Sequence, residues 1–431
     1  MRLPGRIAAA IDILTEIEAR HRPVAEALKS WGLANRFAGA GDRAAIGNLV
    51  YDALRRRRSH AFLMGSDEPR AAVLSVLVRE WGIAPDELAD QFAADAHAPA
   101  TLSATEVHDL GAYQSLDSAP DHIRADVPEW VVEQLRESLG EGWVAEAQAL
   151  AGRPPLDLRV NTLKSSPDKV LRSLDRFSPQ AGPVTVDGIR IPAGSADSRT
   201  PNVQIDEAYL KGWFEVQDQG SQAVSLLAGA KAGEQVLDLC AGAGGKSLAM
   251  AAAMHNKGQV FAFDSDRNRL APIYDRLKRN GVRNVQVRPP NPGALDDLLG
   301  KLDRVLIDAP CTGTGTWRRQ PTAKWKLTPT QLAERVAEQK ALLDQAVTYL
   351  KPGGHLVYIT CSVLADENAR QATAFLERHP DFVAVPGNTL WMKQFSASGM
   401  RAHFSPEGGI LLTPLQTGTD GFYLFMARRD A

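Results

Sequence analysis

The chain has 431 residues, of which 44% are hydrophobic and 23% are charged, and its net charge is −2. This length exceeds what one hydrophobic core supports, so we expect two or three domains in a protein of ordinary globular composition. The three cysteines, Cys240, Cys311 and Cys361, lack a Cys-x-x-Cys spacing, and the most apolar N-terminal run, residues 7–14, is interrupted by Asp12. The sequence therefore predicts a cytoplasmic protein without a disulfide framework, a metal site or a membrane span.

Charge is distributed unevenly along the chain. Residues 1–60 hold 11 basic and 6 acidic groups, including the run Arg55–Arg58, whereas residues 61–150 are strongly acidic. From residue 151 onward, 34 basic groups stand against 28 acidic ones. A polyanion would thus meet the beginning of the chain and its C-terminal two-thirds. The alternative for Arg55–Arg58 is a solvated helix end, where cations suit the helix dipole.

Residues 1 to about 125 predict helices only. The clearest is residues 42–54, because Ile46, Leu49 and Val50 recur at helical spacing behind Asp42, a residue suited to the N-cap. Further helices are expected over residues 7–14, 71–81 and 85–94. Residues 96–126 are rich in Ala, Pro, Ser and Asp, which is typical of a linker.

Residues 126–214 predict a small accessory segment of mixed α/β structure, which begins with a helix after Pro128 and continues with a strand over residues 155–161. From residue 215, strands alternate with helices, and this alternation predicts a parallel sheet covered on both faces.

Polar side chains follow four of the expected strands directly. The strand at 236–239 runs into a glycine-rich loop at 240–246, and the strand at 260–263 ends at Asp264. The strand at 302–307 runs into Asp308 and Cys311, and the strand at 354–360 precedes Cys361. Ligands bind beyond the carboxyl ends of strands in open α/β sheets. If the last two strands are neighbours, both sulfurs face the same crevice.

The glycine loop fits neither of two common nucleotide-binding patterns. A P-loop would need glycine where Cys240 stands, and a dinucleotide fingerprint beginning at Gly242 would need glycine at Ser247. What remains is a strand, a glycine turn, a helix and Asp264 after the next strand. This pattern suits an adenosine ligand without a pyrophosphate, such as S-adenosylmethionine, with Asp264 on the ribose.

These motifs, taken together, resemble those of the S-adenosylmethionine-dependent RNA cytosine-5 methyltransferases, the RsmB/NSUN family. The resemblance rests on the loop at 240–246, Asp264, the run Asp308-Ala-Pro-Cys-Thr-Gly-Thr-Gly315, and Thr360-Cys-Ser362 with Asp366-Glu-Asn368. Arg159-Val-Asn161, residues 217–222 and Asp420-Gly-Phe422 match outside this core, and the pattern at 42–55 resembles a NusB-like RNA-binding bundle.

The resemblance implies a Rossmann-like methyltransferase sheet at 215–431, preceded by an all-helical NusB-like domain at 1–125 and the mixed α/β accessory segment at 126–214. It assigns covalent attack on the base to Cys361, assistance in release to Cys311 and contact with the base edge to Asp308. It assigns cofactor binding to Cys240, Ala241, Gly242, Ala243, Gly244, Gly245, Lys246, Asp264 and Asp308. Relatives often carry an aspartate for the adenine after the third strand; here Asn291 stands in that segment and is the candidate replacement.

The implied substrate is RNA, with 16S rRNA expected, for a monomeric enzyme that acts on neither DNA nor membranes. Trp317, Arg318, Arg319 and Lys324 place aromatic and cationic side chains in one long loop, which suits stacking on unpaired bases and contact with phosphates. A packed surface loop is the alternative. For the whole chain, the alternatives are the same chemistry on tRNA or another rRNA site, and a ribosome assembly factor whose methyltransferase fold is vestigial.

Overall fold

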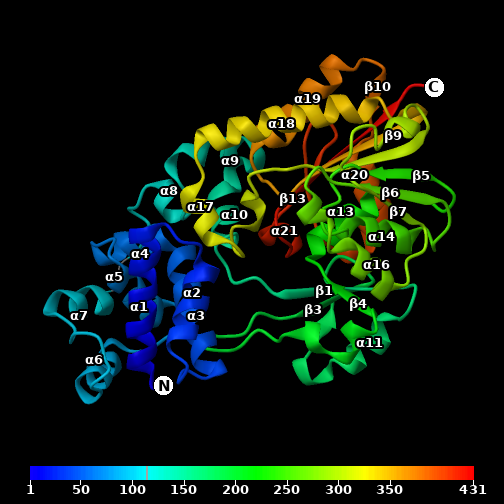
Figure 1. The fold of residues 1–431 in the computed structure, drawn as a ribbon. Helices are drawn as coiled ribbons and strands as arrows, with labels where there is room; N and C mark the ends of the chain where they lie inside the picture. Colours follow the sequence, from blue (N-terminus) through cyan, green and yellow to red (C-terminus); the bar gives the residue numbers. More distant parts are fainter. Residues whose placement is uncertain (113–114) are drawn as a thin grey trace.

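The computed structural model describes residues 1–112 and 115–431. Figure 1 shows a helical domain, a large sheet covered by helices, and a small sheet between them in sequence. The helical domain contains α1 (Leu3–Arg20), α2 (Val24–Ala34), α3 (Ala40–Arg55), α4 (Arg57–Met64), α5 (Pro69–Arg79), α6 (Pro85–Ala94), α7 (Ala104–Gly111) and α8 (Asp121–Arg124). The prediction of helices in this region is confirmed for the residues that the structure describes.

The core of the helical domain forms where the apolar stripes of α1, α3 and α5 meet. Ile7, Leu49 and Leu74 are fully buried in this one cluster, as the helical spacing predicted for α3 requires. The predicted cap at Asp42 is wrong, because the helix begins two residues earlier. Asp42 lies in the first turn instead, where its Oδ2 accepts the backbone N–H of Gly39 at 3.0 Å.

The predicted linker at 96–126 is wrong in part, because helices α7 and α8 lie within it. Helix α7 begins with a capping box, in which the Ser103 hydroxyl accepts the N–H of Glu106 and the Glu106 carboxylate accepts the N–H of Ser103. Leu110 on this helix is buried in the core of the helical domain. The low apolar content of this region led to the wrong prediction, because a short capped helix needs only one buried apolar side chain, here Leu110, to hold it against the core.

The accessory segment consists of two parts that pack differently. Its elements are α9 (Val132–Leu139), α10 (Trp143–Ala149), β1 (Leu156–Val160), α11 (Pro167–Ser173), β2 (Gln180–Ala181), β3 (Gly188–Ile191), α12 (Glu207–Leu210) and β4 (Phe214–Val216). Leu135 and Trp143 on the two helices join the hydrophobic core of the large sheet. The strands form an antiparallel sheet of order β2-β3-β1-β4 with a separate core around Phe214.

The large sheet follows a helix, α13 (Gln219–Leu227). Its first half contains β5 (Gln235–Asp238), α14 (Gly245–Ala253), β6 (Gln259–Phe263), α15 (Arg267–Leu270), α16 (Ile273–Asn280), β7 (Val285–Arg288) and β8 (Leu302–Asp308). Its second half contains α17 (Pro321–Lys326), α18 (Pro329–Val347), β9 (Leu350–Thr360), α19 (Ala369–Arg378), β10 (Phe382–Ala384), α20 (Gly387–Phe395), β11 (His403–Phe404), β12 (Ile410–Leu412), α21 (Pro414–Thr417) and β13 (Phe422–Arg429).

The strand order is β11-β12-β13-β9-β8-β5-β6-β7, with β10 paired to β13. Strands β7, β6, β5, β8 and β9 are parallel, as the alternating pattern predicted, and β8 lies next to β9. Strand β13 runs antiparallel to β9, so the sheet is mixed rather than wholly parallel. The predicted Rossmann-like sheet with an all-helical N-terminal region is confirmed. Among the described residues, no helix combines the length and the apolarity needed to cross a membrane.

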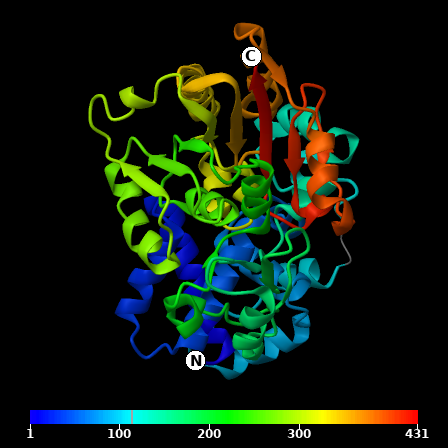
Figure 2. The same cartoon turned by 90° about the vertical axis from the view of Figure 1, so that its right-hand side faces the viewer.

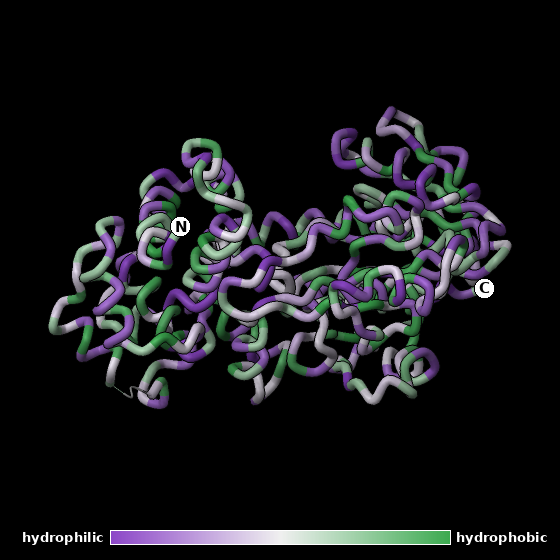
Figure 3. The backbone as a smooth tube through the Cα atoms, turned by 90° about the horizontal axis from the view of Figure 1, so that it is seen from below, coloured by the Kyte–Doolittle hydropathy of each residue, from purple (hydrophilic) through white to green (hydrophobic). Residues whose placement is uncertain are grey.

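The helical domain docks onto the large domain through α17 and the end of α3. Seen from below, the two form adjacent lobes (Figure 3), and the chain termini lie at opposite ends of the molecule (Figure 2). The last carbonyls of α3 lack partners within their own helix. The carbonyl of Leu54 accepts from the Trp325 indole at 2.6 Å, and the carbonyl of Arg55 accepts from the Lys324 ammonium at 2.7 Å. Side chains of α17 thus cap α3 across the domain junction.

Burial lowers the pKa of Lys324 to about 7. In the unfolded chain the amine keeps its ordinary, higher pKa, so between these values the unfolded state binds more protons and folding is favoured as pH rises. We expect the melting temperature of the wild type relative to K324M to rise from pH 7 to pH 9, measured by thermal unfolding. K326M, on the exposed side of α17, is the control. A pH-independent difference between wild type and K324M would contradict the burial of a titrating amine.

Candidate functional site

The two predicted thiols meet at the carboxyl ends of β8 and β9. These strands are parallel neighbours, with Asp308 in register with Ile359, so the turns that follow them lie side by side. The sulfur of Cys311 lies 3.4 Å from the sulfur of Cys361, and both side chains are partly exposed. The structure therefore brings both sulfurs to one edge of the sheet, in the turns that follow Asp308 and Thr360.

Hydrogen bonds tie the two cysteine turns to each other. The backbone N–H of Gly315 donates to the carbonyl of Cys361 at 2.9 Å, and the hydroxyls of Thr314 and Ser362 lie 3.0 Å apart. A side chain at position 315 has no room, because a Cβ there would lie 2.2 Å from the carbonyl oxygen of Gly421. This contact explains why glycines stand in both the run after Asp308 and the Asp420-Gly-Phe422 segment. The sulfur positions are thus set by packed backbone.

The environment of Cys311 favours the protonated thiol. Contact with Cys361 raises the pKa of Cys311 well above its ordinary value, and burial and the nearby Glu367 carboxylate raise it further. Glu367 is fully buried and accepts the N–H of Thr312 at 2.8 Å, the Thr312 hydroxyl, and the amide of Gln339 at 3.0 Å. In the sequence, Glu367 was noted only as part of the motif Asp366-Glu-Asn368, and no role was predicted for it. Its position six residues after Cys361, which follows the end of β9, was the available signal.

We expect E367Q to slow turnover by about tenfold to a hundredfold. The N–H and hydroxyl of Thr312 then donate to a neutral amide instead of a carboxylate, and a hydrogen bond to a charged acceptor is worth about 1.5–3 kcal/mol. The same change should shift the alkylation of Cys311 to lower pH, since one of the charges that raise its pKa is gone. Iodoacetamide rates across pH, followed by peptide mass spectrometry, measure this shift. E377Q, on the exposed face of α19, is the control. An unaltered alkylation profile in E367Q would contradict the electrostatic role.

The glycine loop, Asp264 and Asp308 form the second half of the site. Gly242 and Gly244 have positive φ angles of 49° and 82°, as a tight turn into α14 requires. The Asp264 carboxylate, which is almost fully buried, accepts the N–H of Gly242 at 2.9 Å and so ties the loop to the end of β6. The Lys246 ammonium lies 2.6 Å from Oδ2 of Asp308. This ion pair joins the glycine loop to the cysteine turns.

These groups fit the amino-acid end of S-adenosylmethionine. Lys246 and Asp308 present opposite charges side by side, which complements a ligand carrying a carboxylate and an ammonium. At the foot of the loop, Oδ1 of the buried Asp238 has no hydrogen-bond partner among the described residues, and burial raises the pKa of Asp238 to about 7. A buried carboxylate oxygen without a hydrogen-bond partner suits a site in which a bound polar ligand supplies the missing hydrogen bond.

The buried Cys240 lies at the start of the loop, and burial raises the pKa of its thiol well above the ordinary value. A thiol that stays protonated suits the cofactor-binding role predicted for Cys240 rather than that of a nucleophile. Asn291 lies at the surface, where its side-chain oxygen accepts from Arg267 at 3.4 Å. Its role toward the adenine stays a prediction.

Three of the four residues predicted to touch RNA are inaccessible, so that part of the prediction is wrong. Trp317 is 1% exposed, Arg318 5% and Lys324 2%, because the loop after Gly315 packs against the end of α3. The Arg318 guanidinium donates to Asp420, and the backbone carbonyl of Arg318 accepts from Arg55 at 2.8 Å. Arg319 alone keeps a partly exposed side chain. Here the tryptophan and the neighbouring cations form a domain junction. Their spacing in the sequence is the same as that expected for a surface that stacks on bases, so the sequence could not distinguish the two.

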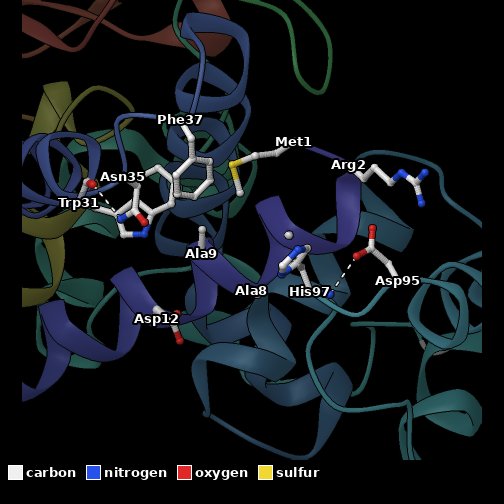
Figure 4. Close-up of a pocket in the computed structure, with 11 residues that line it drawn as sticks. Met1, Arg2, Ala8, Ala9, Asp12, Trp31, Asn35, Phe37, Asp95 and His97 are labelled. Atoms are coloured by element: carbon white, nitrogen blue, oxygen red, sulfur yellow. Dashed lines mark hydrogen bonds between the residues drawn. The ribbon is translucent and has the colours of Figure 1, made fainter.

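The helical domain has a hollow of its own, of about 450 Å³. Figure 4 shows Phe37, Trp31 and Met1 around it, with His97 and Asp95 on the facing side. All of its lining residues fall within residues 1–97, so it belongs to the helical domain and is separate from the cysteine turns.

Comparison with known proteins places this site in a family. Residues 225–427 match the family described as 16S rRNA methyltransferase RsmB/F, and residues 127–195 match the RsmF/B-like ferredoxin-like domain. The ribosomal RNA small subunit methyltransferase B of Erwinia tasmaniensis is 35% identical over 302 residues, which cover 69% of this chain and 65% of that protein. The match thus spans less than two thirds of that relative's length.

Two solved structures share the fold. The crystal structure of PH0851 has a TM-score of 0.72 at 23% identity and covers 100% of this chain and 99% of that one. A methyltransferase homolog from Pyrococcus horikoshii has a TM-score of 0.57 at 27% identity and covers 72% of this chain and 97% of that one. Residues 225–427, which hold the paired cysteines, match the RsmB/F methyltransferase family, and this match supports the predicted cofactor, S-adenosylmethionine.

Proposed function

We propose that this chain transfers a methyl group from S-adenosylmethionine to carbon 5 of a cytosine in 16S rRNA through a covalent cysteine–cytosine adduct. The observation that carries the proposal is the pair of sulfurs, 3.4 Å apart, in the turns that follow Asp308 and Thr360. Carbon 5 of cytosine is a poor nucleophile, and a thiolate added at carbon 6 makes the ring electron-rich. When bound, S-adenosylmethionine supplies the electrophilic methyl group.

Cys361 acts as the nucleophile in this proposal. The raised pKa of Cys311 keeps a proton on that sulfur, and its S–H can donate to the neighbouring Cys361 sulfur, which stabilises a thiolate there. The Cys361 thiolate bonds to carbon 6, and the electron pair of the ring double bond moves to carbon 5. After methylation, a base takes the proton from carbon 5, the electron pair of that C–H bond re-forms the ring double bond, and the bond from carbon 6 to sulfur breaks to release Cys361 as a thiolate. The Cys311 S–H then assists release by stabilising the leaving thiolate.

Asp308 and Lys246 hold the reactants in this scheme. The Asp308 carboxylate, about one-third exposed, can accept a hydrogen bond from the base edge while Lys246 pairs with its other side. The target cytosine has to leave its stack to reach Cys361, because the two sulfurs are only partly exposed and the ring atoms of a stacked base are covered by its neighbours. We further propose that the protein acts as a cytoplasmic monomer on RNA and not on DNA.

Methylation of RNA with labelled S-adenosylmethionine, followed by nucleoside analysis, tests the reaction. 5-Methylcytidine is the expected product, and bisulfite sequencing of rRNA and tRNA from a deletion strain separates the 16S target from a tRNA or another rRNA site. A different labelled nucleoside would overturn the proposal. Calorimetry with S-adenosylmethionine tests the remaining alternative, since a vestigial assembly factor would not bind the cofactor.

A further inference from the structure

A cavity of about 300 Å³ lies where all three parts of the chain meet. Tyr51 and Arg55 line it from α3 of the helical domain, Arg153 and Thr200 line it from the accessory segment, and Arg319 lines it from the loop that follows the Cys311 turn. Three guanidinium groups from three separate parts of the fold thus face one hollow. Buried or partly buried like charges repel, so their convergence needs a compensating anion.

The carboxylates that pair with these cations are not among the residues that line the cavity. Asp52 forms ion pairs with both Arg55 and Arg153; the distance from Nη1 of Arg55 to Oδ1 of Asp52 is 2.8 Å. Asp218 and Asp420 serve both Arg319 and the buried Arg318. Each of these guanidiniums therefore has a carboxylate partner, but none of the residues that line the cavity is acidic, so the lining itself presents only cationic and neutral groups.

The remaining wall of the cavity is polar and suits an anion with several acceptor oxygens. Tyr51, Ser198 and Thr200 bring hydroxyl groups to it, whereas the amide N–H groups of Asn48 donate to the carbonyls of Ala196 and Ser198. Guanidinium groups present flat forks of N–H donors, which match the oxygens of a phosphate. Arg153 and Arg319 keep partly exposed side chains, so an incoming phosphate can reach them from solvent.

The cavity is also connected to the reaction site along a short stretch of chain. Arg319 lies four residues after Gly315, whose N–H holds the carbonyl of Cys361. A strand of RNA seated here would contact the helical domain, the accessory segment and the cysteine turn together.

We propose that this cavity binds a backbone phosphate of the RNA substrate and so fixes the strand relative to the cysteines. The inference rests on the proposed function, because it takes RNA as the substrate. It places the RNA path over Arg319, Arg153 and Thr200 rather than over the buried Trp317, Arg318 and Lys324.

A charge placed at the cavity mouth tests the proposal without breaking the buried ion pairs. Thr200 is exposed, and T200E adds a carboxylate that competes with a phosphate for Arg153 and Arg319, whereas T200Q adds the same length without charge. We expect T200E to bind RNA about tenfold more weakly than T200Q, with the slope of log K against log salt smaller by about 0.7, the loss of one phosphate contact. R283Q, at an exposed arginine outside the cavity, should match the wild type.

Fluorescence anisotropy of labelled RNA across KCl concentrations measures these slopes, and calorimetry with S-adenosylmethionine shows that each variant is folded. If T200E fails to bind the cofactor, A193E against A193Q, also at the mouth, repeats the test. Inorganic phosphate at constant ionic strength should weaken RNA binding to the wild type more than to T200E. A cavity that takes inorganic phosphate while T200E and T200Q bind RNA alike would be an anion site unconnected to RNA, and that result overturns the inference.

Failure of this inference is distinguishable from failure of the proposed function. If the wild type methylates cytosine and T200E binds RNA as T200Q does, only the phosphate site is wrong. If the wild type neither binds RNA nor methylates it, the proposed function itself is wrong.

Discussion

C311A should accumulate a covalent RNA adduct that survives denaturing electrophoresis, whereas C361S should form no adduct and lose turnover. The reason is the contact between the two sulfurs at 3.4 Å, across which the S–H of Cys311 can donate to the sulfur of Cys361. Without the S–H of Cys311, Cys361 can still add to carbon 6, but its departure as a thiolate loses a stabilising donor. Without the Cys361 sulfur, no bond to the base forms, because a serine hydroxyl is a far weaker nucleophile at neutral pH.

The adduct is measured as a slower protein band that carries labelled RNA and disappears after nuclease treatment. C240S is the control for loss of a thiol, since Cys240 lies at the glycine loop and not between the two turns. An adduct in C361S and none in C311A would reverse the two roles. No adduct in either variant, with normal methylation in both, would remove covalent catalysis from the proposal.

D308N should lower kcat/KM by about a hundredfold to a thousandfold, the range seen when a group that stabilises developing charge is removed. The amide keeps the shape of the side chain but loses the charge that pairs with Lys246 at 2.6 Å and faces the base. We expect weaker binding of S-adenosylmethionine as well, because Lys246 is left partly buried without its anion.

The matched control is D303N, which changes the same group near the opposite end of β8. Asp303 accepts the N–H of Gln235 at 2.8 Å and pairs with Lys351, so its loss affects stability rather than catalysis. Steady-state methylation kinetics and calorimetry with the cofactor separate the two variants. Equal losses in D303N and D308N would mean that the strand, and not the carboxylate at its end, carries the effect.

The predictions that held concern features that are local in sequence. Strands read from apolar runs ended where Asp308 and Cys361 were expected, and the strand–helix alternation predicted the core of the large sheet. Periodicity sets which face of a helix or strand is buried, and glycine-rich turns mark close approach of backbone. Those signals lie within ten or twenty residues, so one sequence is enough to read them.

The sequence by itself thus determined the order of elements, the residues at the strand ends and the likeness to a methyltransferase family. Only the tertiary structure decided that Cys311 and Cys361 touch, that Glu367 holds the turn between them, and that Trp317, Arg318 and Lys324 fasten one domain to another. The physical reason is that burial and pairing depend on residues far apart in the chain. Lys324 meets a carbonyl 269 positions away, and no pattern around either residue records that contact.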